Sequence, residues 1–371
     1  MLKTKIFAAY LPQYHEIPEN NEFWGEGFTD WIGVLHATPQ FENHKQPRVP
    51  LNQNYYDLSK PEVIRWQSEL ARKYCVGFNI YHYWFKNGHK VLEKPAELLL
   101  ENKDIDITYF FSWDNSSWIR SWSNIRGNAW APAFDSSRQQ GILLELDYGN
   151  ESDWKQHFEY LLPFFQDDRY FKICGKPVFA LMATSNYEVL IRMRIFWDKL
   201  AREHGFSGIF IITGTRIAFN RNVLDAQFVY QPRIASWGRR ETIERLLQKY
   251  LKINLPPQDR YVKYCYDYSE VWKRIIKHAE KNIKNTDLYF GSFVRYDDTP
   301  RRGKNFCIII NETPELFKQY FGQLYKLCCE HDKEFLFLTA WNEWGEGAYL
   351  EPDEENGYAY LEAVKRVVDS F

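Results

Sequence analysis

Short apolar runs that favour β-strands alternate with stretches of helical periodicity along most of this 371-residue chain. The strand-like runs occupy eight ranges: 5–10, 76–83, 107–113, 177–182, 208–213, 226–230, 288–294 and 335–341. Strands that alternate with helices favour parallel pairing in βα units. The pattern therefore predicts an α/β fold, a single (β/α)8 TIM barrel over residues 1–371 with long loop insertions at its carboxyl-terminal mouth. A doubly wound sheet is disfavoured because no glycine-rich turn follows the first run.

Several of the intervening segments carry helix start signals. Ser59-Lys60-Pro61-Glu62 reads as a capping box with proline in the first turn, and Thr313-Pro314 begins a second strong helix. Weaker helical patterns cover 153–165, 187–202, 241–251 and 269–283.

Three connections, 11–58, 114–152 and 231–268, are much longer than the others, and each follows a predicted strand. In a parallel barrel such loops meet at the carboxyl-terminal mouth, where active sites are built. Aromatic residues make up 18% of the chain, more than one core needs, so we expect some rings to line a groove that suits a ligand with an apolar face and hydroxyl groups. The tryptophans in or next to these loops are Trp24, Trp31, Trp113, Trp118, Trp122, Trp130 and Trp237.

Charge and cysteine content narrow the range of partners. The chain has 47 Lys and Arg against 49 Asp and Glu, which removes the main argument for a nucleic-acid or anionic-membrane partner. No apolar run approaches the ~20 residues that span a bilayer. The apolar patch at 6–11 is too short for a secretory signal, so we expect a cytoplasmic protein. The six cysteines lack C-x-x-C spacing, which predicts reduced thiols, no metal site and, with no nucleotide-binding motif, no cofactor.

The last predicted strand runs into two carboxylates three positions apart, Glu343 and Glu346. On a turn, which Gly345 and Gly347 permit, such residues become neighbours about 5–6 Å apart. That separation is near the ~5–5.5 Å of a glycosidase that retains anomeric configuration. Close carboxylates also separate their pKa values, so that one serves as an acid and the other as a base. The alternative is a strand end with two solvated glutamates.

Other candidates have alternative interpretations. Glu26, in a Trp-Gly-Glu-Gly echo of residues 344–347, is a rival carboxylate at the same mouth. His82 is either a satisfied core residue or a catalyst, and an error of one residue in register would exchange it with Tyr81 as the pocket-facing group. Asp297 and Asp298 either bind sugar hydroxyls or start a turn. The Asp104/Asp106 pair precedes a strand and lies at the opposite end of a barrel, so it is discounted as a metal site.

Seven motifs together resemble the WbsX-type family: residues 9–15 (AYLPQYH), 24–31 (WGEGFTDW), 46–48 (QPR), 55–58 (YYDL), 81–85 (YHYWF), 298–302 (DTPRR) and 341–352 (WNEWGEGAYLEP). This family is labelled as glycosyltransferases of lipopolysaccharide or O-antigen synthesis. It is also similar to glycoside hydrolase family 99, the endo-α-mannosidases and endo-mannanases, which are (β/α)8 barrels. Position 298, usually asparagine in the family, is aspartate here, which changes its hydrogen-bonding polarity.

The resemblance implies a retaining, endo-acting glycosidase or transglycosylase on a bacterial polysaccharide. Glu343 would be the base that removes the proton of the sugar 2-OH, and Glu346 the acid that protonates the leaving oxygen. The resulting 1,2-anhydro sugar favours α-manno- or α-rhamno-configured glycans. A glycosyltransferase and a non-catalytic glycan-binding barrel are the alternatives. We expect the glycan to contact Tyr10, Gln13, His15, Trp31, Tyr81, His82, Trp84, Trp113, Asp114, Gln231, Asp297, Asp298, Trp341, Asn342 and Trp344.

Overall fold

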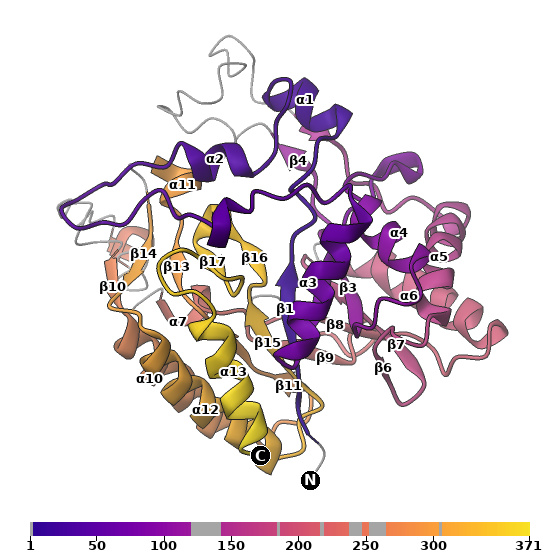
Figure 1. Ribbon diagram of the computed structural model, residues 1–371. Helices are drawn as coiled ribbons and strands as arrows, with labels where there is room; N and C mark the ends of the chain where they lie inside the picture. Colours follow the sequence, from indigo (N-terminus) through magenta and orange to yellow (C-terminus); the bar gives the residue numbers. More distant parts are fainter. Residues whose placement is uncertain are drawn as a thin grey trace.

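In the computed structural model, eight parallel strand positions form the centre of the molecule, and helices surround them (Figure 1). The structure describes residues 3–119, 142–183, 186–215, 219–236, 247–251, 265–303 and 306–371. The barrel strands are β1 (Lys5–Tyr10), β2 (Val76–His82), β3 (Tyr109–Trp113), β7 (Lys176–Leu181), β8 (Phe210–Gly214), β9 (Ala226–Phe228), β11 with β12, and β15 (Phe335–Thr339). The predicted (β/α)8 barrel is confirmed.

The seventh strand closes the barrel in two pieces. The predicted strand 288–294 is interrupted at Phe290 and gives β11 (Leu288–Tyr289) and β12 (Gly291–Phe293). The first piece pairs with β9 and the second with β15, both in parallel. Because β15 also pairs with β1, the sheet closes on itself.

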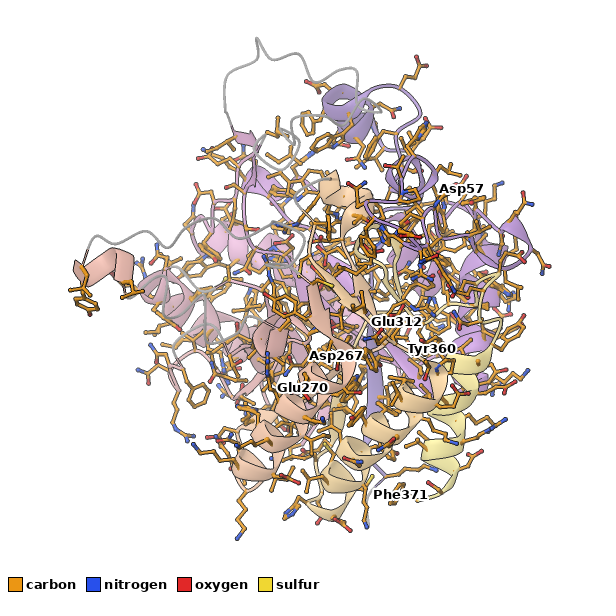
Figure 2. The ribbon with its side chains drawn as sticks, turned by 90° about the vertical axis from the view of Figure 1, so that its left-hand side faces the viewer. Asp57, Asp267, Glu270, Glu312, Tyr360 and Phe371 are labelled. Carbon is orange, nitrogen blue, oxygen red and sulfur yellow. The ribbon has the colours of Figure 1, made fainter. Side chains whose placement is uncertain are left out.

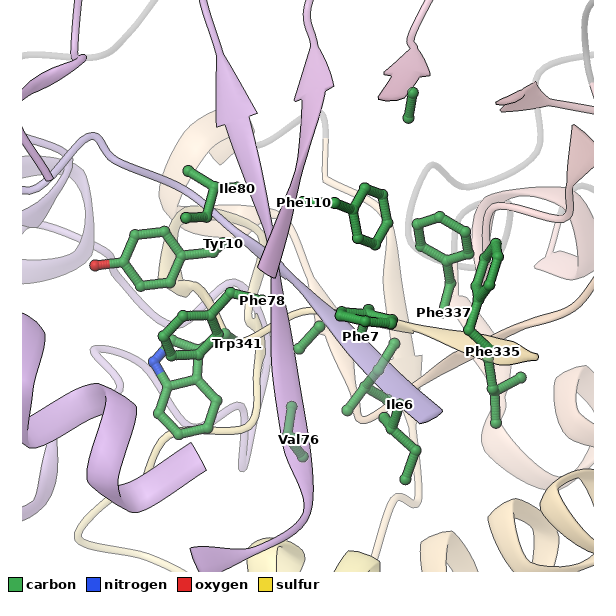
Figure 3. Close-up of a cluster of buried hydrophobic side chains, with 14 of the residues drawn as sticks. Ile6, Phe7, Tyr10, Val76, Phe78, Ile80, Phe110, Phe335, Phe337 and Trp341 are labelled. Carbon is green, nitrogen blue, oxygen red and sulfur yellow. The ribbon is translucent and has the colours of Figure 1, made fainter. Parts of the chain in front are cut away.

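Alternate residues of each strand face either the barrel interior or the helices. Phe7 contacts Phe110 at 4.9 Å between ring centroids, although β1 and β3 are not neighbours, and Phe110 contacts Phe337 at 5.8 Å. These rings fill the barrel interior (Figure 3). Phe78 instead packs against Trp341 on the other side of the sheet, as the same view shows. On β2, the alternation therefore turns Tyr81 inward and His82 toward the helices.

The outer layer consists of α3 (Pro61–Lys73), α4 (Lys94–Glu101), α5 (Glu151–Gln166), α6 (Tyr187–Glu203), α10 (Tyr268–Asn282), α12 (Pro314–Glu330) and α13 (Ala359–Asp369). Thr313 caps α12, its side chain accepting from the Leu316 N–H, as predicted. The prediction of a capping box at residues 59–62 is wrong. Because the helix begins at Pro61, Lys60 takes the capping position without a side-chain bond, and Ser59 instead donates its N–H to Asp57.

The long loops gather at the end of the barrel to which the strands point. Loop 11–58 contains α1 (Pro18–Trp24), α2 (Trp31–Leu35) and the turn η1 (Leu51–Gln53), and α1 and α2 lie at the top in Figure 1. Figure 2 shows Asp57 toward this end and Phe371 at the other. Trp122, Trp130, Trp237 and residues 241–246 of the predicted helix 241–251 lie outside the described residues; 247–251 form a π-helical turn. In the part of the chain that the structure describes, every helix is too short or too polar to cross a bilayer.

Candidate active site

The two predicted carboxylates lie on a tight turn beyond β15. This turn consists of β16 (Asn342–Glu343), a single 3-10 turn, η6 (Trp344–Glu346), and β17 (Ala348–Tyr349), which pairs antiparallel with β16. A 3-10 turn has three residues per turn, so residues three apart point the same way. Gly347 ends it with φ +56°, and a Cβ there would lie 2.8 Å from the Asp297 carbonyl oxygen, so only glycine fits.

Arg301 joins the two carboxylates. It lies on α11 (Thr299–Arg302), and its Nη2 is 3.0 Å from Glu343 Oε1 while its Nη1 is 3.2 Å from Glu346 Oε1. The same Nη2 lies 3.3 Å from Asp30 Oδ2. A Cβ at Gly345 would lie only 3.3 Å from this guanidinium, so the guanidinium packs directly against the backbone of Gly345. Because one side chain reaches both glutamates, their carboxylates face a common space.

The two glutamates differ in environment. The side chain of Glu343 is 7% exposed and that of Glu346 is 19% exposed. Burial is the main cause that raises the pKa of Glu343 to about 8; Arg301 opposes it, and the charges of Glu346 and Asp30 add to it. Burial likewise raises the pKa of Asp30. The pair therefore retains a proton near neutral pH, which allows one acid and one base to act side by side.

Tyrosine side chains form one wall of the space beside the glutamates. Besides burial, the charge of Glu343 raises the pKa values of Tyr81, Tyr83 and Tyr230, which places all three hydroxyls near that carboxylate. The Gln13 amide lies 3.0 Å from the Tyr83 hydroxyl. Asp114 belongs to the same wall, because its charge raises the pKa of Tyr83. Of the predicted binding residues, Tyr81, Gln13 and Asp114 thus lie together at the mouth.

His82, Trp84 and Trp113 lie outside this space and pack against α5. The His82 Nε2 is 2.8 Å from the Nε2 of His157, and the Trp84 ring stacks on His157 at 4.4 Å. Trp113 meets the same imidazole edge-on at 4.7 Å. Burial lowers the pKa of His82 to about 3, so this histidine pair is neutral. Since His82 faces the helices, Tyr81 is the pocket-facing residue of the two.

A second group of predicted residues supports the turn from behind. The Asn342 side chain accepts from Leu11 N at 2.8 Å and donates to Leu11 O at 3.0 Å, which ties the turn to the end of β1. The other members of this group are the buried aromatic residues Tyr10, Trp31, Trp341 and Trp344. The Trp31 indole donates to Tyr56 O.

Two residues predicted to contact the glycan, Asp297 and Asp298, instead form hydrogen bonds and ion pairs with other residues of the protein. Asp297 is bonded by His44 (2.8 Å), Gln46 (2.6 Å) and Thr299, so it anchors the first long loop. Asp298 pairs with Arg302 at 2.9 Å, and burial raises its pKa to about 7.

Gln231 and His15 are both buried. Gln231 accepts from the Ala235 N–H, and burial lowers the pKa of His15. Neither residue is brought to the glutamate pair by a contact in the described structure.

The rival acidic residues do not join the glutamate pair. Glu26 is exposed on the loop after α1. Asp104 and Asp106, before β3, form exposed ion pairs with Arg65 and Arg72. Within the described ranges, no group of three or more His, Cys, Asp or Glu side chains is arranged to hold a metal ion.

Four residues beside the glutamates were not predicted as site residues: Arg301, Asp30, Tyr83 and Tyr230. Asp30 and Arg301 stand inside two of the motifs already recognised, at 24–31 and 298–302, so a signal was available. Their position beside the glutamates follows from loop geometry, which no local pattern encodes.

Solved structures with this architecture include glycoside hydrolases. The "GH99 endo-alpha-mannosidase from Bacteroides thetaiotaomicron" is similar, with a TM-score of 0.56 and 14% identity over 100% of this chain and 98% of that one. A "Glycoside hydrolase-like protein" gives a TM-score of 0.57 and 13% identity over 99% of this chain and 94% of that one. At these identities the likeness shows a common fold.

Sequence relatives are longer than this chain. "Uncharacterized protein WxcX" of Xanthomonas campestris pv. campestris (strain B100) is 27% identical over 375 residues, which cover 99% of this chain and 50% of the relative. The chain thus spans about half the length of the curated relatives it matches. The family model described as "Glycosyltransferase WbsX" matches residues 6–364, and the chain therefore belongs to the WbsX family.

Proposed function

We propose that this chain is a retaining, endo-acting glycosidase or transglycosylase that acts on an α-manno- or α-rhamno-configured bacterial polysaccharide. The observation that carries the proposal is the pairing of Glu343 and Glu346 through the one guanidinium of Arg301 at the mouth of the barrel. Two facing carboxylates that retain one proton can remove a proton and supply one during the same displacement.

The proposed reaction uses the 2-hydroxyl of the sugar as its nucleophile. Glu343 removes the proton of that hydroxyl, O2 attacks C1 from the face opposite the leaving oxygen, and Glu346 protonates this oxygen as the glycosidic bond breaks. The product is a 1,2-anhydro sugar. Water or a sugar hydroxyl then opens it at C1 by giving its proton to Glu346, while Glu343 returns a proton to O2.

Arg301 contributes electrostatically. Its charge opposes the effect of burial on the pKa of Glu343 and so lowers the pH at which this side chain becomes the carboxylate that acts as base. The tyrosine wall of Tyr81, Tyr83 and Tyr230 offers flat rings with hydroxyl tips, which suit one face of a sugar.

Backside attack restricts the substrate. It needs O2 anti to the leaving oxygen, a trans-diaxial arrangement that α-mannosides and α-rhamnosides have and α-glucosides lack. Polysaccharides with α-manno and α-rhamno linkages should therefore be cleaved while α-glucans remain intact. Cleavage of α-glucans alone would disprove the anhydro route.

A glycosyltransferase that uses an activated sugar donor is the second candidate, because the description of the family model favours it. The test is to incubate the protein with a panel of cell-surface polysaccharides, with and without nucleotide sugars, and to measure product masses. Shortened chains without nucleotide support cleavage, whereas extension that requires nucleotide supports transfer. Glu343→Gln and Glu346→Gln should each lower turnover at least about 10³-fold. If wild type is inactive throughout and Glu343→Gln binds glycan equally well, the barrel is a glycan-binding module.

A further inference from the structure

The buried carboxylate of Glu351 lies behind the turn that carries the two glutamates. Its Oε2 accepts from the Trp344 Nε1 at 2.7 Å and from the Tyr56 hydroxyl at 2.8 Å. Its Oε1 accepts from the Gln67 Nε2 at 2.7 Å. Three donors, from η6, the first long loop and α3, thus converge on one side chain.

This carboxylate has an unusual set of partners for a buried acid. Among the described residues, Glu351 forms no ion pair with a lysine or arginine, and the side chains that donate to it are uncharged. A buried carboxylate without a cation costs free energy unless hydrogen bonds satisfy its oxygens. The three bonds fill this role, and they also fix the groups that donate them.

Trp344 connects Glu351 to the glutamate pair, since it stands between Glu343 and Glu346 in the 3-10 turn. Its ring stacks on Tyr349 at 3.6 Å, and its backbone N–H donates to the Tyr14 hydroxyl at 3.1 Å. That hydroxyl donates in turn to the Asn342 carbonyl at 2.7 Å. The residues on both sides of Glu343 are therefore held by side chains of the same buried network.

We propose that Glu351 is a positioning residue: its carboxylate holds the Trp344 indole and so fixes the turn that presents Glu343 and Glu346 to the glycan. Glu351 does not touch the substrate in this role. The catalytic part of the inference rests on the proposed function, whereas the hold on Trp344 is a property of the free protein.

The hold on Trp344 can be tested without substrate. Burial raises the pKa of Glu351 to about 7, so the Trp344 indole ¹H–¹⁵N signal, assigned with Trp344→Phe, should show a transition near that pH. The titratable groups that face Glu351 are Tyr10, Tyr14 and Tyr56, whose pKa values burial raises far above this range. Glu351→Gln should shift the signal and abolish the transition, and Glu343→Gln should preserve it. An unchanged signal in Glu351→Gln overturns the proposal.

The catalytic role is tested on a polysaccharide that the wild-type protein cleaves. Glu351→Gln should lower kcat about 10- to 100-fold with KM changed less than about twofold, because a displaced turn misplaces both carboxylates. Glu351→Asp, which retains the charge, should recover part of the rate and guards against a folding defect. Glu354→Gln is the matched control, since Glu354 is exposed on the same loop and its side chain bonds only Asn52 N in the described structure. A folded Glu351→Gln protein with wild-type kcat overturns the positioning role. If wild type cleaves nothing, the proposed function fails, and the indole signal still decides whether Glu351 holds Trp344.

Discussion

The Nη2 of Arg301 lies 3.0 Å from the Oε1 of Glu343, so the most buried acid of the site has a cation as its neighbour. The same guanidinium also bonds Glu346 and Asp30. Three carboxylates thus share one positive charge, which makes Arg301 the residue that sets how many protons the site holds.

Replacement of Arg301 should change the pH profile as well as the rate. Arg301→Gln removes the charge that lowers the pKa of Glu343, so this pKa rises above its present value of about 8. The base then loses its proton only at higher pH, and the ascending limb of the activity profile moves up. We expect kcat/KM at neutral pH to fall about 100-fold. Arg302→Gln, whose guanidinium bonds Asp298, is the control, and an unmoved profile in Arg301→Gln would count against this role.

Substitutions at Tyr81 and at His82 should have different effects: the first on activity and the second on the free energy of unfolding. Tyr81→Phe removes a hydroxyl from the pocket and should lower activity about 10-fold with little change in the free energy of unfolding. His82→Ala leaves a cavity and an unpaired His157, so it should cost about 2–4 kcal/mol of that free energy while the folded fraction stays active. Urea unfolding and turnover measure both effects. The reverse pattern would place His82 in the pocket.

The free energy of unfolding should decrease as pH rises from about 5 to 8. Burial raises the pKa of Glu343 to about 8 and that of Glu351 to about 7, so the folded chain holds protons that the unfolded chain has lost above its pKa of about 4.3. The folded state therefore loses stability with rising pH until both groups have ionised, with a slope of at most about 1.4 kcal/mol per pH unit from each. Glu343→Gln should flatten the curve and Glu354→Gln should not. A curve that rises through this range in wild type would contradict the assignment.

Asp297 should contribute to stability rather than to sugar binding. Although burial alone would raise it, bonds from His44, Thr299 and Gln46 keep the pKa of Asp297 below its usual range. Its contribution is thus present above about pH 4 and is lost as pH falls through the lower pKa of the folded state. Asp297→Asn should cost about 2–4 kcal/mol at neutral pH, measured by urea unfolding, with KM unchanged. A raised KM at unchanged stability would instead support contact with the sugar.

The barrel could be predicted because each strand has a local signature. The eight apolar runs match the eight strand positions of the barrel, but the interruption at Phe290 was not predicted. It arises because β11 pairs with β9 and β12 pairs with β15, and no local pattern encodes which strand is the neighbour. The start of α3 was missed for a local reason: Ser59 precedes the proline by two positions, and the helix begins at that proline.

The candidate site could be predicted only in part. The spacing of Glu343 and Glu346 pointed to the turn, but strand-end position alone did not reveal which side chains face inward. His82, Trp84 and Trp113 were grouped with Tyr81, although alternation along the strand directs His82 outward. Arg301 lies 42 positions and Asp30 lies 313 positions before Glu343 in the sequence, so only tertiary packing brings these residues together.

Contacts that complete this site join distant parts of the sequence: Leu11 bonds Asn342 across 331 positions, and Tyr56 bonds Glu351 across 295. On the ribosome, β1 emerges before β15 and must wait for it before both of its edges are paired. Until then the growing chain exposes an unpaired strand edge and apolar rings such as Phe7, which are features that promote aggregation. The nascent protein thus assembles the glutamate pair with its supporting residues and gains protection from self-association in the same late step.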